Sequence, residues 1–168
     1  MPLLSKTVVG VFLCLVTAGI AQTTEVALGG LKQDSSQPVQ VAADQLKVDQ
    51  ANGSATFTGN VIITQGTLKL SADQVDVEYL AGQSGATGKI NRMIAAGNVL
   101  LVTPTEAAQA EQAVYTVASS EIVMTGDVVL TQGASALSGQ KITVNLVTGT
   151  ALVEGRVTTT LQTGGTSP

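Results

Sequence analysis

The sequence contains no histidine, no tryptophan and a single cysteine, Cys14. Without histidine the chain cannot form the Ser-His-Asp or Cys-His arrangements of hydrolases, and it lacks the usual zinc and copper ligands. One cysteine leaves no disulfide to staple the fold. We therefore expect that the protein is not an enzyme, that it uses no metal or cofactor, and that its stability comes from burial and strand pairing.

Aromatic residues and positive charges are also scarce. Only two Phe and two Tyr are present, although 44% of the residues are hydrophobic. The core must then be built from Val, Leu, Ile and Ala. The chain carries 8 Lys and Arg against 12 Asp and Glu, a formal net charge of −4. Nucleic-acid phosphates require clustered basic side chains, so this balance excludes a nucleic-acid partner.

The first 21 residues are typical of a secretory signal peptide. Lys6 provides a positive start, Val8–Val16 an apolar stretch, and Gly19-Ile20-Ala21 a small-residue cleavage site before Gln22. The alternative is a membrane anchor, but the apolar stretch is shorter than the roughly 20 residues that a bilayer requires. We therefore expect export with cleavage, followed by a flexible leader at 22–37.

Two short signals recur along the rest of the chain. The first is a Gly-x-Val step, which begins at Gly59, Gly97, Gly126 and Gly155. The second is a small residue followed by a polar one, namely Ala43-Asp44, Ala72-Asp73, Ala110-Glu111 and Gly139-Gln140. From each Gly-x-Val to the next polar residue the spacing is constant (59 to 73, 97 to 111, 126 to 140). An internal repeat of about 29 residues, interrupted by one insertion within Leu80–Lys89, predicts a stacked architecture.

Within each repeat the apolar residues alternate with polar ones, which predicts half-buried β-strands. Asn52-Gly53 between two alternating runs indicates a hairpin, and Gln65-Gly66 indicates another turn. A helix is an alternative only over Thr105–Ala113, where Ala and Glu dominate; the repeat favours a strand there. The composition from Thr163 onward is typical of a disordered tail.

The alternation slips by one residue at Ala72-Asp73, and again after Ala108 and after Leu137. A slip of one residue would turn the wrong face inward unless the strand bends or bulges. The recurring mid-strand glycines, Gly59 and its equivalents, are a second sign of bending. We therefore predict corners at which each strand passes from one sheet to another, with Asp44, Asp73 and Glu111 as solvated corner residues rather than catalytic ones.

The inward positions form a continuous apolar stripe of aliphatic side chains. Most such stripes are closed, dry cores. Because almost no aromatic residue is available to fill the middle, a groove that accepts acyl chains is the competing interpretation. Burial of each methylene group in such a groove contributes about 0.8 kcal/mol. The sequence leaves both interpretations open.

Several segments resemble the LptA/OstA family of periplasmic lipopolysaccharide-transport proteins. They are Val41–Leu46, Phe57–Val61, Leu70–Asp73 and Met124–Gly133. The resemblance implies an all-β fold over 38–162, a twisted open β-jellyroll of many consecutive antiparallel strands, with a disordered tail at 163–168. It also implies a periplasmic bridge that carries lipopolysaccharide from the inner to the outer membrane.

In that family, lipid A acyl chains lie in the apolar groove and molecules join end to end by strand pairing. The implied partners are lipopolysaccharide, an LptC-like inner-membrane protein, an LptD-like outer-membrane protein and further copies of the chain. Carried over by position, the candidate lipid-binding residues are Leu46, Phe57, Val61, Ile63, Val75, Val77, Tyr115, Met124 and Val128.

Two other functions remain as alternatives. An LptC-like component of the same pathway would keep residues 1–21 as an inner-membrane anchor. An exported structural β-solenoid would bind no lipid and would have a filled interior. Cleavage before Gln22 separates the first alternative from the main interpretation, and lipid binding separates the second.

Overall fold

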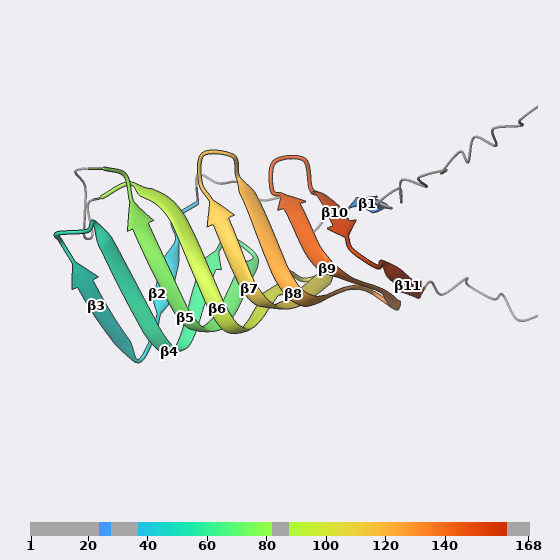
Figure 1. Ribbon diagram of the computed structural model, residues 1–168, viewed down its shortest axis with the longest axis horizontal. Helices are drawn as coiled ribbons and strands as arrows, with labels where there is room; N and C mark the ends of the chain where they lie inside the picture. Colours follow the sequence, from blue (N-terminus) through green and yellow to red (C-terminus); the bar gives the residue numbers. More distant parts are fainter. Residues whose placement is uncertain (1–23, 28–36, 82–87, 161–168) are drawn as a thin grey trace, which may run out of the picture.

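The computed structural model describes residues 24–27, 37–81 and 88–160, and within these ranges the fold is all-β (Figure 1). Eleven strands form one antiparallel sheet. They are β1 (Thr24–Ala27), β2 (Gln40–Ala42), β3 (Gln45–Asp49), β4 (Ser54–Gln65), β5 (Leu68–Tyr79), β6 (Ile90–Val102), β7 (Glu106–Thr116), β8 (Glu121–Gln132), β9 (Ser135–Asn145), β10 (Thr150–Glu154) and β11 (Thr158–Thr160).

From β3 to β10 each strand pairs with the next in sequence, and β2 also pairs with β4, so the sheet grows along one axis. Its order is β1-β10-β9-β8-β7-β6-β5-β4-β2, with β3 also on β4 and β11 also on β9. The predicted run of consecutive antiparallel strands is confirmed, and β7 occupies the segment for which a helix was the alternative.

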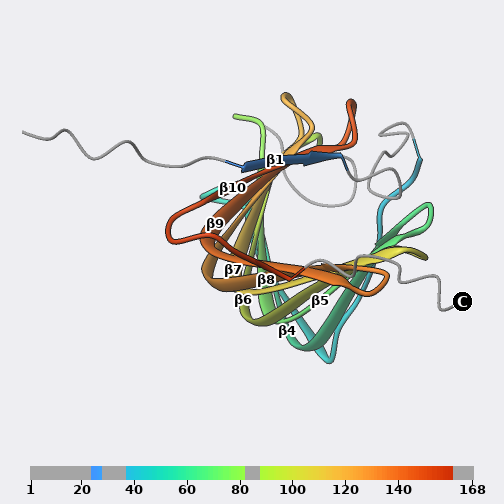
Figure 2. The ribbon, with the colours of Figure 1, turned by 90° about the vertical axis from the view of Figure 1, so that its right-hand side faces the viewer.

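Each long strand bends once near its middle, which divides the sheet into two arms. Arm A contains β3, β10 and the halves of β4–β9 that lie between them in the sheet. In β4, for example, this half is residues 54–58, which pair with β3. Arm B contains β2, β11 and the remaining parts, such as 61–65 of β4. Figure 2, which looks along the axis of growth, shows the strands superposed in this bent profile.

Glycine provides the bend in alternate strands. In β4, Gly59 and Asn60 have φ values of +77° and +46°, and the register with β5 shifts between Thr58 and Val61. Glycine adopts this left-handed conformation readily, and Asn tolerates it better than most residues. The same pair of left-handed residues recurs at Gly97-Asn98, Gly126-Asp127 and Gly155-Arg156. We call these four positions the glycine corners, and they lie where the sequence predicts corners.

A polar side chain packs on each glycine corner from the preceding strand. A Cβ atom built on Gly59 would lie 2.5 Å from Oδ2 of Asp44, and Asn60 Nδ2 donates a hydrogen bond of 2.8 Å to the same oxygen. Equivalent contacts join Asp73 to Gly97, Glu111 to Gly126 and Gln140 to Gly155. We call Asp44, Asp73, Glu111 and Gln140 the polar corners. All four are exposed, as the sequence predicts for the three acids among them.

Short turns connect the strands at the two rims of the sheet. Asp49 closes the predicted hairpin, because its Oδ1 accepts hydrogen bonds from the backbone N–H groups of Ala51 and Asn52. Gly53 and Gly66 both have positive φ in their turns. At the insertion, Leu80 N donates to Lys89 O, while residues 82–87 lie outside the described residues.

The leader contains a strand, which the sequence analysis did not anticipate. β1 pairs antiparallel with β10, with Thr24 opposite Val153 and Ala27 opposite Thr150. The expectation of a flexible segment over all of 22–37 is therefore wrong at these four residues. The outer edge of β10 has N–H and C=O groups that no other described strand pairs, and these groups allow the short segment 24–27 to become a strand. Residues 1–23, 28–36 and 161–168, with the predicted signal peptide and tail, lie outside the described residues.

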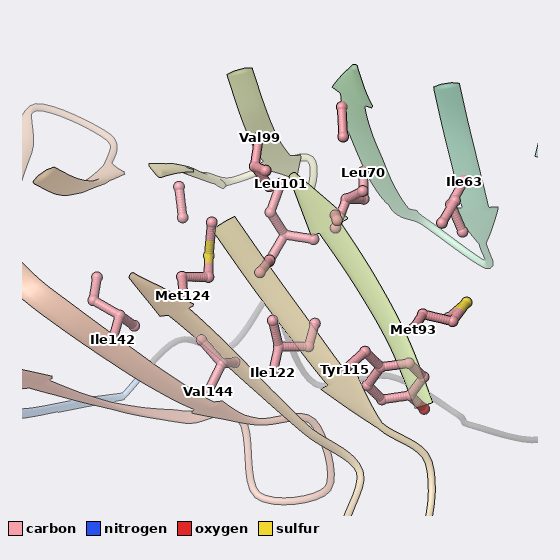
Figure 3. Packing of buried hydrophobic residues seen from close by; sticks show 14 of the residues in the cluster. Ile63, Leu70, Met93, Val99, Leu101, Tyr115, Ile122, Met124, Ile142 and Val144 are labelled. Carbon is pink, nitrogen blue, oxygen red and sulfur yellow. The ribbon is translucent and has the colours of Figure 1, made fainter. Parts of the chain in front are cut away.

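The inward side chains form rows that run across the strands (Figure 3). In arm A one row follows cross-strand pairs through Leu46, Phe57, Val75, Ala95, Ala113, Met124, Ile142 and Val153. In arm B a row runs through Val41, Ile63, Leu70, Leu101, Ala108, Leu130 and Leu137. Because the strands bend at the corners, these two rows belong to one apolar interior between the arms.

Candidate functional site

The interior between the arms contains a small apolar cavity. Its volume is about 30 Å³, close to the space that one water molecule occupies in the liquid. It is lined by Val39, Ile63, Gln65, Leu68, Leu70, Val75, Met93, Ala95, Ala113, Tyr115, Ile122 and Leu146. Both arms contribute, because Ile63 and Leu70 come from arm B while Met93, Tyr115 and Ile122 come from arm A. No charged side chain lines the cavity.

A larger recess opens beside this cavity at the rim of the fold. It has a volume of about 550 Å³, and Val39, Gln65, Met93 and Tyr115 border both spaces. Its other lining residues are Gln37, which precedes β2, and residues from the ends of the insertion, the start of β6 and the β7–β8 turn, namely Leu80, Gly88, Lys89, Ile90, Asn91, Val117 and Ala118. The recess is therefore open to solvent and borders the interior cavity.

The predicted lipid-binding residues fall into three groups. Ile63, Val75 and Tyr115 line the cavity. Val61, Val77, Met124 and Val128 are fully buried members of the same core, and Phe57 is half-buried against it. Leu46 is different: its side chain is 56% exposed. It belongs to an inward row, but β3 lies at the edge of the sheet, and no described strand beyond it covers the side chain.

Other cavity residues were not among the predicted set. Ala95 and Ala113 occupy repeat positions equivalent to Phe57 and Val75, so the internal repeat carried a signal for them. Met93 and Ile122 lie two residues before Ala95 and Met124 on the same faces, and alternation would have found them too. Val39 and Leu146 lie outside the strands, where no periodic pattern identifies them.

Polar groups gather at the rim of arm B. Glu106 is only 4% exposed, and its Oε2 accepts hydrogen bonds of 2.5 Å from Thr103 Oγ1 and 2.6 Å from Thr105 Oγ1. Its Oε1 accepts a bond of 3.2 Å from Gln132 Nε2. Nearby Gln65, also buried, donates from Nε2 to the carbonyl oxygen of Gln37 at 2.9 Å. These bonds satisfy the buried polar side-chain atoms among the described residues.

The chemistry of the interior suits hydrocarbon. Burial desolvates the Tyr115 hydroxyl and raises its pKa above the ordinary value of 10.0, as expected for a side chain in apolar surroundings. Across the described ranges, no three Asp or Glu side chains come together as a possible metal site. Nor do those ranges include a helix long and apolar enough to cross a bilayer. What the interior offers to a ligand is burial of apolar surface.

Comparison with known proteins identifies the family to which the repeated strands belong. A family model described as "LptA/(LptD N-terminal domain) LPS transport protein" matches residues 40–150, from the start of β2 to the start of β10. The chain belongs to this family. An uncharacterized protein of Rhizobium meliloti strain 1021 is 32% identical over 150 residues, which is 85% of this chain and 81% of that protein.

Named LptA-family proteins are also similar. The lipopolysaccharide export system protein LptA of Escherichia coli K12 is 37% identical over 118 residues, 66% of this chain and 60% of LptA. The match thus spans less than two thirds of that relative. The crystal structure of LptH, described as the LptA-homologous periplasmic component of a lipopolysaccharide transport device in Pseudomonas aeruginosa, superposes with a TM-score of 0.66. It covers 77% of this chain and 99% of LptH at 20% identity, so it confirms the fold.

Proposed function

We propose that this protein is a periplasmic lipopolysaccharide carrier that holds lipid A acyl chains between its two arms. The observation that supports this most directly is the mostly apolar, uncharged cavity, which both arms line and which shares four lining residues with a solvent-open recess. Membership of the LptA family supports the lipid class and the periplasmic location, and the predicted signal peptide agrees with that location. The carrier acts as a passive conduit, because its interior offers burial and no chemistry.

Acyl chains need more room than the interior contains in this state. The cavity, of about 30 Å³, is far too small for an acyl chain, so the proposal requires the arms to separate as the lipid enters through the recess. Met93 and Tyr115 border both spaces and lie close together in the core (Figure 3), so we place them on the entry route. Met is suited to this place because its unbranched, flexible side chain adapts its shape. Each buried methylene then contributes about 0.8 kcal/mol to binding.

We further propose that copies join end to end by strand pairing and thereby span the periplasm. The edge strands β2 and β3 at one end present backbone groups that no described strand pairs, and such an edge is a template for β-augmentation. Leu46 and Val48, which are 56% and 45% exposed, add apolar surface at this edge. An LptC-like protein at the inner membrane and an LptD-like protein at the outer membrane are the partners proposed for the two ends.

Photo-crosslinking in living cells tests the lipid-binding part. A photoreactive residue replaces Phe57, Val77 or Tyr115 on the inward face, and Thr58 or Asp76 on the outward face serves as the control. We expect lipopolysaccharide adducts at the three inward positions only. Adducts at none of the five positions would leave a dry core and favour the structural β-solenoid. Retention of residues 1–21 on the mature protein would instead favour an LptC-like anchored component.

A further inference from the structure

The two kinds of corner alternate along the sheet. The β2–β3 pair carries a polar corner, β4 a glycine corner, β5 a polar corner, and the alternation continues to β9, which is polar, and to β10–β11, which carries the glycine corner at Gly155. The sheet therefore begins with one kind of corner and ends with the other. A second copy placed beyond β10–β11 would present its β2–β3 edge and would continue the alternation without a break.

The register at such a junction follows from the register inside the sheet. Wherever a polar-corner strand follows a glycine-corner strand, the same two pairings flank the corner. The residue before the glycine pairs with the residue after the polar corner, as in Thr58–Gln74, Ala96–Gln112 and Thr125–Lys141. The Val two residues after the glycine pairs with the small residue before the polar corner, as in Val61–Ala72, Val99–Ala110 and Val128–Gly139.

Applied to the free ends, this rule pairs Glu154 of one copy with Gln45 of the next, and Val157 with Ala43. The register then places Leu46 of the next copy opposite Val153 and Val48 opposite Ala151, so both inward rows of arm A continue into the next copy. The strand lengths also agree: β3 and β10 have five residues each, and β2 and β11 have three each. The exposed Leu46 and Val48 side chains would become buried.

β1 occupies half of this junction. It pairs with β10 in the same antiparallel sense, with Thr24 opposite Val153 and Val26 opposite Ala151 (Figure 1). These are the places that the register assigns to Leu46 and Val48 of the next copy. We propose that β1 holds the place of the next copy's β3, so that the leader strand controls end-to-end assembly. This inference rests on the end-to-end assembly proposed above.

β1 and the β2–β3 edge of a second copy differ in how much of the β10–β11 edge they can cover. β1 covers four residues of β10 and belongs to arm A alone, whereas β11 pairs only with β9 among the described strands. An incoming β2–β3 edge can therefore pair first with β11 through its β2, and its β3 then displaces β1 from β10. β1 has the advantage of being tethered to the same chain, which gives it a high effective concentration when copies are dilute. Assembly then proceeds only above the concentration at which the longer edge prevails.

Weakening β1 should promote assembly. In an antiparallel pair, every second residue donates its backbone N–H to the partner strand. One of two neighbouring residues, Glu25 or Val26, therefore donates to β10, and replacing both with proline (Glu25→Pro with Val26→Pro) removes that N–H group. If β1 is seated in about nine copies of ten, its loss lowers the apparent dissociation constant of self-association about tenfold. Sedimentation equilibrium of the mature wild-type and proline-containing proteins measures this change. The matched control carries Glu25→Ala and Val26→Ala, which keep both backbone donors.

Cysteine pairs test the two registers separately, since the chain has no cysteine after Cys14. Glu25→Cys with Leu152→Cys should form a disulfide within one chain and, when oxidised, should block assembly until it is reduced. Lys47→Cys with Leu152→Cys should link two copies, because the junction register makes these residues partners. Lys47→Cys with Thr150→Cys is the control, displaced by two residues, roughly 7 Å along the strand.

The outcomes separate this inference from the function on which it rests. If the proline-containing protein and the wild type associate at the same concentration, β1 does not compete, and the inference fails while end-to-end assembly stands. The inference also fails if oxidised Glu25→Cys/Leu152→Cys assembles as well as the reduced form, or if its disulfide forms only between chains. If no variant associates at any concentration, end-to-end assembly itself is wrong, and the inference is wrong with it. Cross-linking in the displaced pair alone overturns the register.

Discussion

At the scale of single residues, the glycine corners depend on two separate properties of glycine. The left-handed φ requires a residue without steric cost in that region, and the packed polar side chain requires the absence of a Cβ atom. Gly59 needs both, with φ +77° and Asp44 Oδ2 2.5 Å from an added Cβ. Gly133 is not a glycine corner but lies in the turn between β8 and β9. It needs only the first property, because its φ is +57° and nothing lies within 4 Å of an added Cβ atom.

This difference makes a matched pair of substitutions informative. Gly133→Ala should cost about 1 kcal/mol of unfolding free energy, which is the price of the left-handed conformation. Gly59→Ala should cost a further ~1–3 kcal/mol, because the Asp44 carboxylate must move. Urea denaturation of both variants measures the difference. Adding Asp44→Ala should remove most of the extra cost at Gly59; if the two glycine variants are equally destabilised, Asp44 does not constrain this corner.

At the scale of elements, the β6–β7 turn shows how an acidic side chain stabilises a buried rim. Glu106 accepts hydrogen bonds from Thr103, Thr105 and Gln132, and both Glu106 and Thr103 are buried. A buried donor that loses its acceptor retains the full cost of its desolvation. The carboxylate therefore connects the turn to the neighbouring strand β8 and fixes where arm B ends.

Replacement of this carboxylate should loosen the turn. Glu106→Ala should lower the free energy of unfolding by about 1–3 kcal/mol, since the Thr103 hydroxyl loses its short bond to the carboxylate and keeps only a 3.4 Å contact with the carbonyl oxygen of residue 106. Glu121→Ala, a half-buried carboxylate at the start of β8, is the control and should change stability by less than ~0.5 kcal/mol. Chemical denaturation measures stability, and hydrogen exchange at Thr105 and Glu106 localises the effect. Equal losses in the two variants would contradict a special role for Glu106.

The elements also show how far the sequence predicts the structure. Strands, turns and corners were predictable because alternation, Asn52-Gly53 and the spaced glycines are local signals that repeat. The choice of cavity residues was only partly predictable. Every inward residue shares the same pattern, and which of them border free volume depends on how arm A packs against arm B. Thus Ile63 and Val75 line the cavity, whereas Met124 is fully buried but does not line it.

Two elements could not be found from local patterns at all. β1 has four residues and no periodicity of its own, and it becomes a strand only because the distant β10 offers an edge. The exposure of Leu46 likewise reflects the position of β3 at the end of the sheet rather than its own alternation, which is regular. Both cases concern the edges of the sheet, where the partner decides the structure.

At the scale of the whole molecule, the exposed edge permits a separation of folding from assembly. Leu46 is 56% exposed, so Leu46→Glu should change the free energy of unfolding by less than ~0.5 kcal/mol. In an end-to-end assembly the same change would bury a charge opposite Val153 of the neighbouring copy, which is strongly unfavourable. We therefore expect a stable protein that no longer self-associates. Thermal unfolding and light scattering measure the two properties.

Lys47→Glu is the control for this prediction, because it introduces the same side chain on the outward face of the same strand. It should leave self-association nearly unchanged at moderate ionic strength. If Leu46→Glu and Lys47→Glu weaken association alike, net charge rather than the inward row governs it. If neither weakens it, copies associate through another surface.

The alternation of corners gives a row of copies a direction. A junction that joins unlike ends is heterologous, so it has no two-fold axis and does not terminate in a pair. However many copies were added, one tip of such a row would present Asp44 and β2–β3, and the other would present Gly155 and β11, with β1 on the edge of β10. The two tips differ in shape and in chemistry, so each can be recognised by a different membrane protein. If copies join end to end as proposed, a bridge built from this chain would fit between two membranes in only one orientation.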